Sequence, residues 1–442
     1  MILLLKLAFR NAISHWKQSL SALISVAAGF IAFALFDGYM RDIFTIINQL
    51  YGNIEMYGDY IIEHENANKP EGRSHPWDWA LDIKAQNMIN DYFKTHESEI
   101  FAYSRFLNIE GSIDTNNSSF VFIGYGYDIL EGAKLKGKWK WNTYWGKPLH
   151  EIKDNYTTML MGRRLGQFMG CLPEKLDEMK KYFIDLELHP LQRPFTCENE
   201  TFQLTTVTEK GQINATDLSV AGLYDQGFKE FDERYVVMPL ETAQQMYDTQ
   251  KVNFYTLKLK SDVDKNIFAN QFQNYLMSIG STIKIIDWRQ HSKGSIYRQT
   301  LSLLETDRTF VITIIIFVGC LSIFNTLIKL IKERTFEIGM LRSLGFLPQF
   351  IRKLFILESI LLSWIGCIWG IILSFIIAII INKSEITYPS GLFSFESPLR
   401  IEINFMTYVN GVLLMTLLSI IAGFIAIRKP SSQTIANSLI HN

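Results

Sequence analysis

The sequence predicts an integral membrane α-helical protein with four transmembrane helices and a large α+β extracytoplasmic domain inserted between helices 1 and 2. Three observations predict this fold class: four long runs without charge, a long polar segment between the first two runs, and basic residues gathered in the short segments on one side. The chain has 442 residues, 48% of them hydrophobic, and a formal net charge of −1. This balance gives no reason to expect nucleic acid as a partner or a solvating acidic tail.

Four charge-free runs are each long enough to cross a bilayer. They cover 19 to 25 residues, and a helix that rises about 1.5 Å per residue needs about 20 residues to cross about 30 Å of hydrocarbon. A signal peptide is the alternative for the first run, but that run is long for a signal core and no small-residue cleavage site follows it. The runs are Gln18–Phe36, Phe310–Ile328, Ser359–Asn382 and Ile403–Ile427.

Basic residues are concentrated in the short segments on one side of the predicted spans. The amino-terminal segment carries Lys6, Arg10 and Lys17 without an acid, and its helical apolar spacing predicts an amphipathic elbow helix on the membrane surface. The segments after the second and the last run are also basic, whereas residues 383–402 hold more acids than bases. The positive-inside rule therefore places both termini in the cytoplasm and residues 37–307 outside it.

A short charged segment between the second and third runs reads KERTFEIGMLRSLGFLPQF and has the pattern of two helices joined by a tight turn. Its residues Phe336, Met340 and Leu344 are four apart, which places them on one apolar face of a helix. Gly345 is positioned to end that helix in a left-handed conformation, and Pro348 to begin the next one. Such a segment can be a plain cytoplasmic tether, but the apolar stripe favours a hairpin that docks into a groove of another protein.

The outer segment is predicted to be an α+β domain on a two-helix stalk, because helical apolar spacing continues beyond the first run and before the second. Alternating or β-branched runs predict strands at 60–63, 119–123, 201–207, 218–223, 235–238 and 255–260, and helices are predicted at 85–94, 241–248 and 265–279. The predicted parts of the chain are an elbow helix (1–17), transmembrane helix 1 and stalk (18–52), the extracytoplasmic domain (53–292), stalk and transmembrane helix 2 (293–331), a cytoplasmic coupling segment (332–352), transmembrane helix 3 (353–382), a short outer loop (383–402), transmembrane helix 4 (403–428) and a cytoplasmic tail (429–442).

The sequence contains no recognisable catalytic motif. It lacks the phosphate-binding G-x-x-x-x-G-K-[ST] loop, the H-E-x-x-H zinc motif and the G-x-S-x-G nucleophile elbow. The outer histidines, His291 among them, show no ligand spacing, so we expect surface residues and no metal site. Glu358 is expected to be an interfacial or interhelical anchor, and Gly366 and Gly370 permit close helix packing.

Two groups of outer residues leave alternatives open. Cys171 and Cys197 both lie in the outer segment and can form a disulfide if it is extracytoplasmic, but spacing alone does not show that they are bonded. The tryptophans Trp139, Trp141 and Trp145 form either an aromatic shelf for a ligand or packed loop residues, and packing is the more common case.

Several stretches resemble one family of membrane proteins. ERTFEIGMLRSLGF (Glu333–Phe346), with FNTL before it and LESILLSWIGCIWG after it, closely resembles the FtsX-like permeases of MacB-type (type VII, mechanotransmission) ABC transporters. LKLAFRNAISHWKQSLSALI, MGRRLGQFMG and IRKPSSQTIANSL resemble their elbow and first span, an outer-domain segment and their basic tail. Residues Lys210–Tyr247 are similar to a segment of the lipoprotein-release (LolC/LolE-like) group, while the insertion between Cys171 and Cys197 departs from the family.

The resemblance implies a permease subunit that is not itself an enzyme and has no ATP site or cofactor of its own. A separate cytoplasmic ABC ATPase dimer, which binds ATP and Mg, would dock on the coupling segment. Substituting Glu337→Lys or Leu341→Asp would then uncouple ATP hydrolysis while leaving the chain folded. The implied coupling residues are Glu333, Arg334, Glu337, Met340, Leu341 and Arg342.

The resemblance also implies a second permease chain, in a homodimer or a similar heterodimer, and a location in the bacterial inner membrane with the large domain in the periplasm. A lipoprotein or lipid-like cargo would leave the membrane through a cavity beside span one, with a periplasmic carrier or adaptor as a further partner. Residues suited to that cavity, and equally to lipid-facing or core positions, are Phe30, Phe33, Phe36, Tyr39 and Met40.

Three alternatives to lipoprotein release stay open at this point. The first is a drug or peptide efflux permease that works with a periplasmic adaptor and an outer-membrane duct. The second is an FtsX-like relay that activates a cell-wall hydrolase. The third is a membrane-anchored enzyme or receptor without an ATPase, which the missing catalytic motifs and the coupling segment disfavour.

Overall fold

The computed structural model describes residues 16–114, 119–137, 143–152, 157–173, 194–224, 232–384, 386–389, 396–428 and 430. The chain forms two compact units. The first, here called the membrane unit, comprises the described parts of residues 1–45, 301–386 and 399–442, and the second, here called the head, comprises those of residues 46–300 and 387–398. The predicted elbow helix before Trp16, the residues Trp139 and Trp141, and nearly all of the predicted tail lie outside the described residues.

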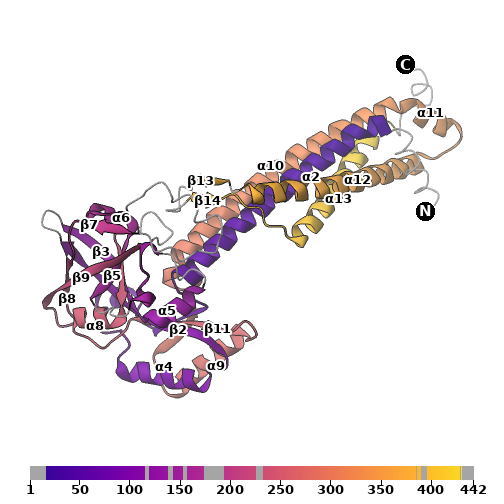
Figure 1. Cartoon of the computed structure of the whole chain (residues 1–442). Coiled ribbons are helices and arrows are strands. Elements are labelled where there is room, and N and C mark those ends of the chain that lie inside the picture. The colour runs from indigo at the N-terminus through magenta and orange to yellow at the C-terminus, as the bar shows by residue number, and fades with distance from the viewer. Residues whose placement is uncertain are drawn as a thin grey trace. The chain divides into compact units, whose positions relative to one another are not determined.

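Four long helices build the membrane unit: α2 (Trp16–Gln49), α10 (Ser295–Glu333), α12 (Pro348–Lys383) and α13 (Phe405–Arg428), as Figure 1 shows. Each contains a stretch long and apolar enough to cross a membrane, as predicted. The helix α2 has 34 residues and α10 has 39. At a rise of about 1.5 Å per residue, both are longer than the hydrocarbon layer of a bilayer, which is about 30 Å thick. The prediction that these two helices continue beyond their spans is confirmed.

Close packing inside the membrane unit centres on Phe30 of α2, which is fully buried. A Cβ atom at Gly370 would lie 2.9 Å from the Phe30 Cβ, and one at Gly411 would lie 2.8 Å from its Cε2. A Cβ atom at Gly366 would likewise lie 2.8 Å from the Cβ of Val26. The missing side chains of α12 and α13 therefore let α2 approach both helices, which is the role predicted for Gly366 and Gly370.

The head is built on one ten-stranded mixed sheet with the order β12-β1-β11-β2-β3-β10-β5-β9-β4, and β8 pairs with β2 and β9. The pairs β3–β10 and β5–β9 are parallel, and the other neighbours are antiparallel. The strands are β1 (Tyr60–His64), β2 (Ile100–Asp114), β3 (Ser119–Tyr127), β4 (Thr143–Gly146), β5 (Thr158–Gly162), β8 (Phe202–Val207), β9 (Ile213–Tyr224), β10 (Tyr235–Pro239), β11 (Phe254–Leu259) and β12 (Ile283–Asp287).

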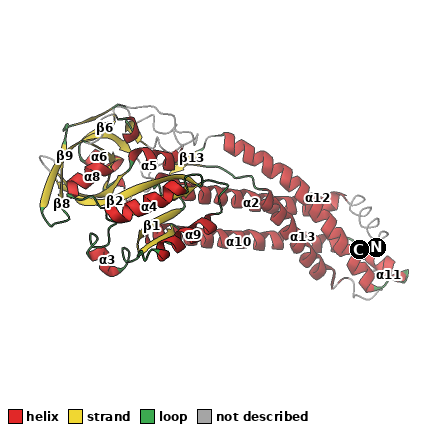
Figure 2. Cartoon of the chain, turned by 90° about the horizontal axis from the view of Figure 1, so that it is seen from below, coloured by secondary structure: helices red, strands yellow, loops and turns green. Residues whose placement is uncertain are grey.

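Helices pack on this sheet and give the head its α+β character, which Figure 2 contrasts with the helical membrane unit. Asp82 caps the start of α4 by accepting a hydrogen bond from the Ala85 N–H at 2.8 Å. The helices α4 and α9 pack against each other, with the rings of Tyr92 and Phe272 4.6 Å apart. The head helices are α3 (Pro70–Ser74), α4 (Ile83–Thr95), α5 (Ile129–Lys136), α6 (Arg163–Phe168), α8 (Leu240–Tyr247) and α9 (Lys265–Ser278).

Two short two-stranded sheets complete the described head. One pairs β6 (Cys171–Pro173) with β7 (Phe195–Cys197), and the other pairs β13 (Thr387–Pro389) with β14 (Glu396–Pro398). Short one-turn segments also join the larger elements: a π-helical turn at Leu50–Ile54 after α2 and 3-10 turns at Leu149–Glu151 and Ser292–Gly294.

All six predicted strands and all three predicted helices of the head are present within a few residues of their expected bounds. The strand β2, the longest of the sheet, was not predicted. Its alternation breaks at Phe106 and Leu107, which are both buried, and Gly111 lies so close to β8 that a Cβ atom there would be 2.2 Å from the Thr205 carbonyl oxygen. Trp145 is fully buried, so for this residue the packed alternative is correct.

The prediction that the outer histidines lie at the surface is wrong for His291, which is buried. Its Nε2 lies 2.7 Å from a carboxylate oxygen of Glu63, and its Nδ1 accepts a hydrogen bond from the Lys293 N–H at 3.1 Å. The imidazole thus ties the turn before α10 to β1. Within the described residues no three His, Cys, Asp or Glu side chains are grouped as a metal site would require.

Candidate functional site

The predicted coupling segment forms a short helix, α11 (Thr335–Ser343), between α10 and α12. The helix α10 ends at Glu333, and Arg334 interrupts the helical conformation before α11 begins. Gly345 has a φ of +92°, so it ends α11 in the predicted left-handed conformation. Pro348 occupies the first turn of α12. The second predicted helix is therefore the beginning of the third spanning helix itself.

The inner face of α11 is held by a buried ion pair. Arg334 is 3% exposed, and its guanidinium donates through Nη1 to the buried carboxylate of Glu358 in α12 and through Nε to Glu337 at 2.9 Å. The same guanidinium lies 5.1 Å from the centre of the Phe355 ring, and Ile338 is fully buried beside it. Glu358 is thus an interhelical anchor, as predicted, and its partner joins the start of α11 to α12.

The outer face of α11 carries the apolar stripe that the sequence predicts. Phe336, Met340 and Leu344 are 57%, 47% and 70% exposed, and we call these three residues the α11 stripe. Leu347, in the turn before α12, is equally exposed and extends the apolar surface. Exposed apolar patches rimmed by charged residues are typical of surfaces that contact another protein or a membrane.

The six predicted coupling residues divide between the two faces of α11. Glu333 and Met340 are exposed, and Glu337 is partly exposed. By contrast, Arg334 is buried, and Leu341 is half-buried against the apolar core of the membrane unit. The expectation that Leu341→Asp leaves the fold intact is therefore corrected, since it would place a charge against this core. Arg342 is half-buried.

The predicted cavity residues of α2 are mostly internal to this chain. Phe30, Phe33 and Met40 are buried among the chain's own helices and present no open surface in this conformation. Phe36 and Tyr39 are half-buried, so they retain some exposed surface on α2.

A second polar cluster, which we call the Asp37 clasp, joins α2, α10 and α13 at the end of the membrane unit opposite α11. The buried carboxylate of Asp37 accepts hydrogen bonds at Oδ1 from the Nε of Arg308 at 3.1 Å and from its Nη2, and at Oδ2 from the Nε of Arg41 at 2.9 Å. The Thr407 hydroxyl donates to the same Oδ2 at 2.6 Å. The sequence patterns did not reveal this cluster, although an acid directly after the first charge-free run and an arginine two residues before the second were a usable signal.

The head contains an aromatic pocket of about 310 Å³, whose lining includes Tyr57, Tyr125, Tyr235 and Lys293. Aromatic ring faces attract cations. Here the chain supplies that cation itself, because the Lys293 Nζ lies 4.3 Å from the centre of the Phe254 ring and 5.0 Å from that of Tyr125. We therefore interpret the pocket as internal packing, in which Lys293 fixes the turn before α10 against the aromatic rings.

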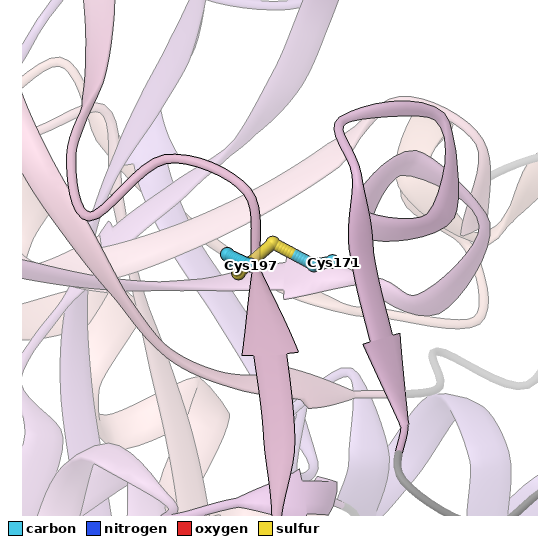
Figure 3. The surroundings of a disulfide bond; sticks show 2 residues. All are labelled: Cys171 and Cys197. Carbon is cyan, nitrogen blue, oxygen red and sulfur yellow. A yellow bond between two sulfur atoms is a disulfide. The ribbon is translucent and has the colours of Figure 1, made fainter.

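Cys171 and Cys197, whose pairing the sequence leaves open, are joined by a disulfide between β6 and β7 (Figure 3). The two cysteines are directly paired in the ladder between these strands. The bond closes the insertion that departs from the family pattern, most of which lies outside the described residues.

Comparison with known proteins finds one family whose model matches part of the membrane unit. Residues 309–435 match the family described as FtsX-like permease C-terminal. The chain is 30% identical over 273 residues to the ABC transporter permease YtrF of Bacillus subtilis, covering 58% of this chain and 53% of the relative. It is 23% identical over 231 residues to the lipoprotein-releasing system transmembrane protein LolC of Xylella fastidiosa, covering 48% of this chain and 51% of the relative.

The chain thus spans about half the length of these relatives. Among solved structures, the periplasmic region of MacB from Actinobacillus actinomycetemcomitans aligns over 57% of this chain and 97% of its own length, with 15% identity and a TM-score of 0.35. The family match covers α10 from Thr309 onward, α11, α12 and α13. The chain therefore carries an FtsX-like permease domain.

Proposed function

We propose that this chain is the permease subunit of an ABC transporter and that a separate cytoplasmic ATPase docks on the α11 stripe. The observation that carries the proposal is the contrast between the two faces of α11: an exposed apolar stripe opposite a face anchored by the buried Arg334–Glu358 pair. A helix that is fixed to the membrane unit on one face can transmit the movement of a partner bound to its other face. The FtsX-like domain and the likeness to YtrF support the same function.

The push would travel along α10 and α12, because Arg334 lies at the end of one and binds Glu358 in the other. From there α10 runs without interruption to Ser295, in the part of the chain that belongs to the head. Nucleotide energy would thus reach the head as movement of rigid helices, and no substrate would pass through the four spans. ATP and Mg would bind only to the partner ATPase.

We further propose that the head lies outside the cytoplasm, in the periplasm of a bacterium, and that both termini lie inside. The disulfide supports this orientation, since such bonds persist in oxidising compartments. The basic residues of the coupling segment support it independently through the positive-inside rule.

The disulfide gives a direct test of this orientation. Intact cells are first left untreated or treated with a reductant that cannot cross the inner membrane, and the protein is then denatured and alkylated. Cys171 and Cys197 are expected to resist alkylation in the untreated sample and to be alkylated in the reduced one. The measurement is the mass shift of the chain, with Cys171→Ser/Cys197→Ser as the control that reports labelling of Cys320 and Cys367. Alkylation without reductant would contradict the bond, and protection that only a permeant reductant removes would contradict the orientation.

For the cargo, we propose a lipoprotein or a similar lipid-bearing molecule, handled together with a second permease chain. The likeness to LolC supports this choice over efflux or hydrolase activation. Of the five predicted cavity residues, Phe36 and Tyr39 are half-buried and keep some exposed surface on α2. Mass spectrometry of lipids and proteins that copurify with the full chain tests the choice: a lipoprotein supports it, and a periplasmic adaptor alone contradicts it.

Docking of an ATPase on α11 is tested by site-specific cross-linking. A photoreactive maleimide attached to Leu344→Cys in native membranes is expected to capture an ATP-hydrolysing protein, because this side chain is 70% exposed on the stripe. The matched control is Leu303→Cys, a leucine of α10 that is 68% exposed near the opposite end of that helix. Equal capture at both positions, or no ATPase at position 344, would refute docking through the stripe.

A further inference from the structure

The Asp37 clasp contains more positive charge than its structural role requires. Within the clasp, Arg308 by itself is enough to connect α10 to α2, since it binds Asp37 through both Nε and Nη2. Arg41 lies one turn after Asp37 on the same helix, so its hydrogen bond to Asp37 does not link α2 to another helix. A pair four residues apart on one helix typically contributes little to stability when its cation is partly exposed, as Arg41 is. The arrangement leaves two guanidinium groups on one carboxylate, with an excess of one positive charge.

The clasp also leaves hydrogen-bond donors unused. Arg41 contacts Asp37 through Nε only, and Arg308 through Nε and Nη2. In the described part of the chain, neither Nη of Arg41 nor the Nη1 of Arg308 has a partner. The two side chains are 30% and 31% exposed, so these donors can be reached from outside. Asp37 is 3% exposed and has both oxygens occupied, so it acts as the fixed support that holds the two guanidinium groups near each other.

The position of the clasp indicates what could reach those donors. Asp37 directly follows the charge-free run Gln18–Phe36, and Arg308 is two residues before the run Phe310–Ile328. The ends of such runs lie at the depth of lipid headgroups when the helices span a bilayer. Guanidinium groups match the geometry of phosphate oxygens and bind them with charge-assisted hydrogen bonds.

We propose that Arg41 and Arg308, held together by Asp37, bind the phosphate group of a membrane phospholipid. Acidic neighbours argue for a lipid phosphate over a soluble one. Glu305 and Asp307 are exposed beside Arg308 in α10 and form no ion pair with either arginine in the part of the chain described. Their charge repels free anions, whereas a phospholipid is kept at this depth by its acyl chains and arrives at high local concentration.

The test uses the full-length chain, purified in mild detergent without ATPase or nucleotide, and a fluorescent-tailed phosphatidylglycerol as the probe. Diacylglycerol with the same tail serves as the ligand that lacks phosphate. We expect the chain to bind phosphatidylglycerol saturably, and Arg41→Gln to weaken this binding about tenfold, as the loss of a charge-assisted contact predicts. Arg41→Gln keeps the Arg308–Asp37 link between α10 and α2, so the helices stay joined. Arg41→Lys retains the positive charge but loses the planar guanidinium group. Its affinity for phosphatidylglycerol is expected to lie between that of the unaltered chain and that of Arg41→Gln.

Lys383→Gln is the matched control, because Lys383 is an exposed cation at the end of α12 and the charge change is the same. Little change is expected for Lys383→Gln, and millimolar inorganic phosphate should not displace the probe. The proposal is overturned if Arg41→Gln binds like the unaltered chain, if Lys383→Gln loses as much, or if diacylglycerol binds equally well. Displacement by inorganic phosphate would overturn the assignment to lipid. Because no ATPase is present, these outcomes are independent of the proposed coupling.

Discussion

Replacing Arg334 by alanine is expected to destabilise the membrane unit by about 3–5 kcal/mol, the usual cost of breaking a buried ion pair by removing one partner. The carboxylate of Glu358 would stay buried without its cation, and α11 would lose its link to α12. If α11 is the docking element, the variant should also fail to support the rate of ATP hydrolysis that the unaltered chain supports in the same reconstituted complex. The measurements are the thermal midpoint of the purified chain in detergent and the ATPase rate of the reconstituted complex.

A double variant separates the ion pair from the packing around it. Arg334→Met/Glu358→Leu replaces the pair with apolar side chains of similar length, and such exchanges are often neutral or stabilising. We expect it to recover most of the thermal stability lost in Arg334→Ala, because no charge is left buried alone. A single variant Arg334→Ala with the stability of the unaltered chain would show that the pair does not hold α11.

Replacing two residues of the α11 stripe, Met340→Asp/Leu344→Asp, is expected to weaken ATPase binding strongly without unfolding the chain. Both side chains are exposed, so the new charges remain in water and the fold loses little packing. In a docked complex the same charges would be buried against an apolar groove, where truncating a hot-spot residue costs about 2 kcal/mol or more. At least a thirtyfold loss of affinity is therefore expected, roughly the equivalent of 2 kcal/mol.

The measurement is copurification of the ATPase with the tagged chain, followed by titration in detergent. Leu303→Asp is the control for a new charge on an exposed leucine elsewhere on the same unit, and it should bind the ATPase normally. Unchanged copurification of the ATPase by the double variant would rule out the stripe as the docking surface. Leu341→Asp is not suitable for this purpose, because Leu341 packs against the helix core and its loss of binding would be confounded with unfolding.

Local sequence patterns predicted some features of the coupling segment but not the role of Arg334. The four-residue spacing of the stripe predicted an exposed apolar face, and the conformational demands of Gly345 and Pro348 predicted both ends of the turn. The same pattern could not tell Arg334 from an exposed docking residue. Its role depends on Glu358, which is far from it in sequence and on a different helix.

The sequence by itself determined the four spans, the long polar insertion, six of the ten strands of the main sheet, three of the six described head helices, and the apolar stripe of α11. These are local properties: a charge-free run of sufficient length, a period of two or of 3.6 residues, or a residue with a restricted φ angle. Only the tertiary structure decided that Phe30 packs against Gly370 and Gly411, that Cys171 bonds Cys197, and that Asp37 of α2 binds Arg308 of α10. Such contacts join residues distant along the chain, and which of them form is decided by the packing of helices and strands, which no short window of sequence contains.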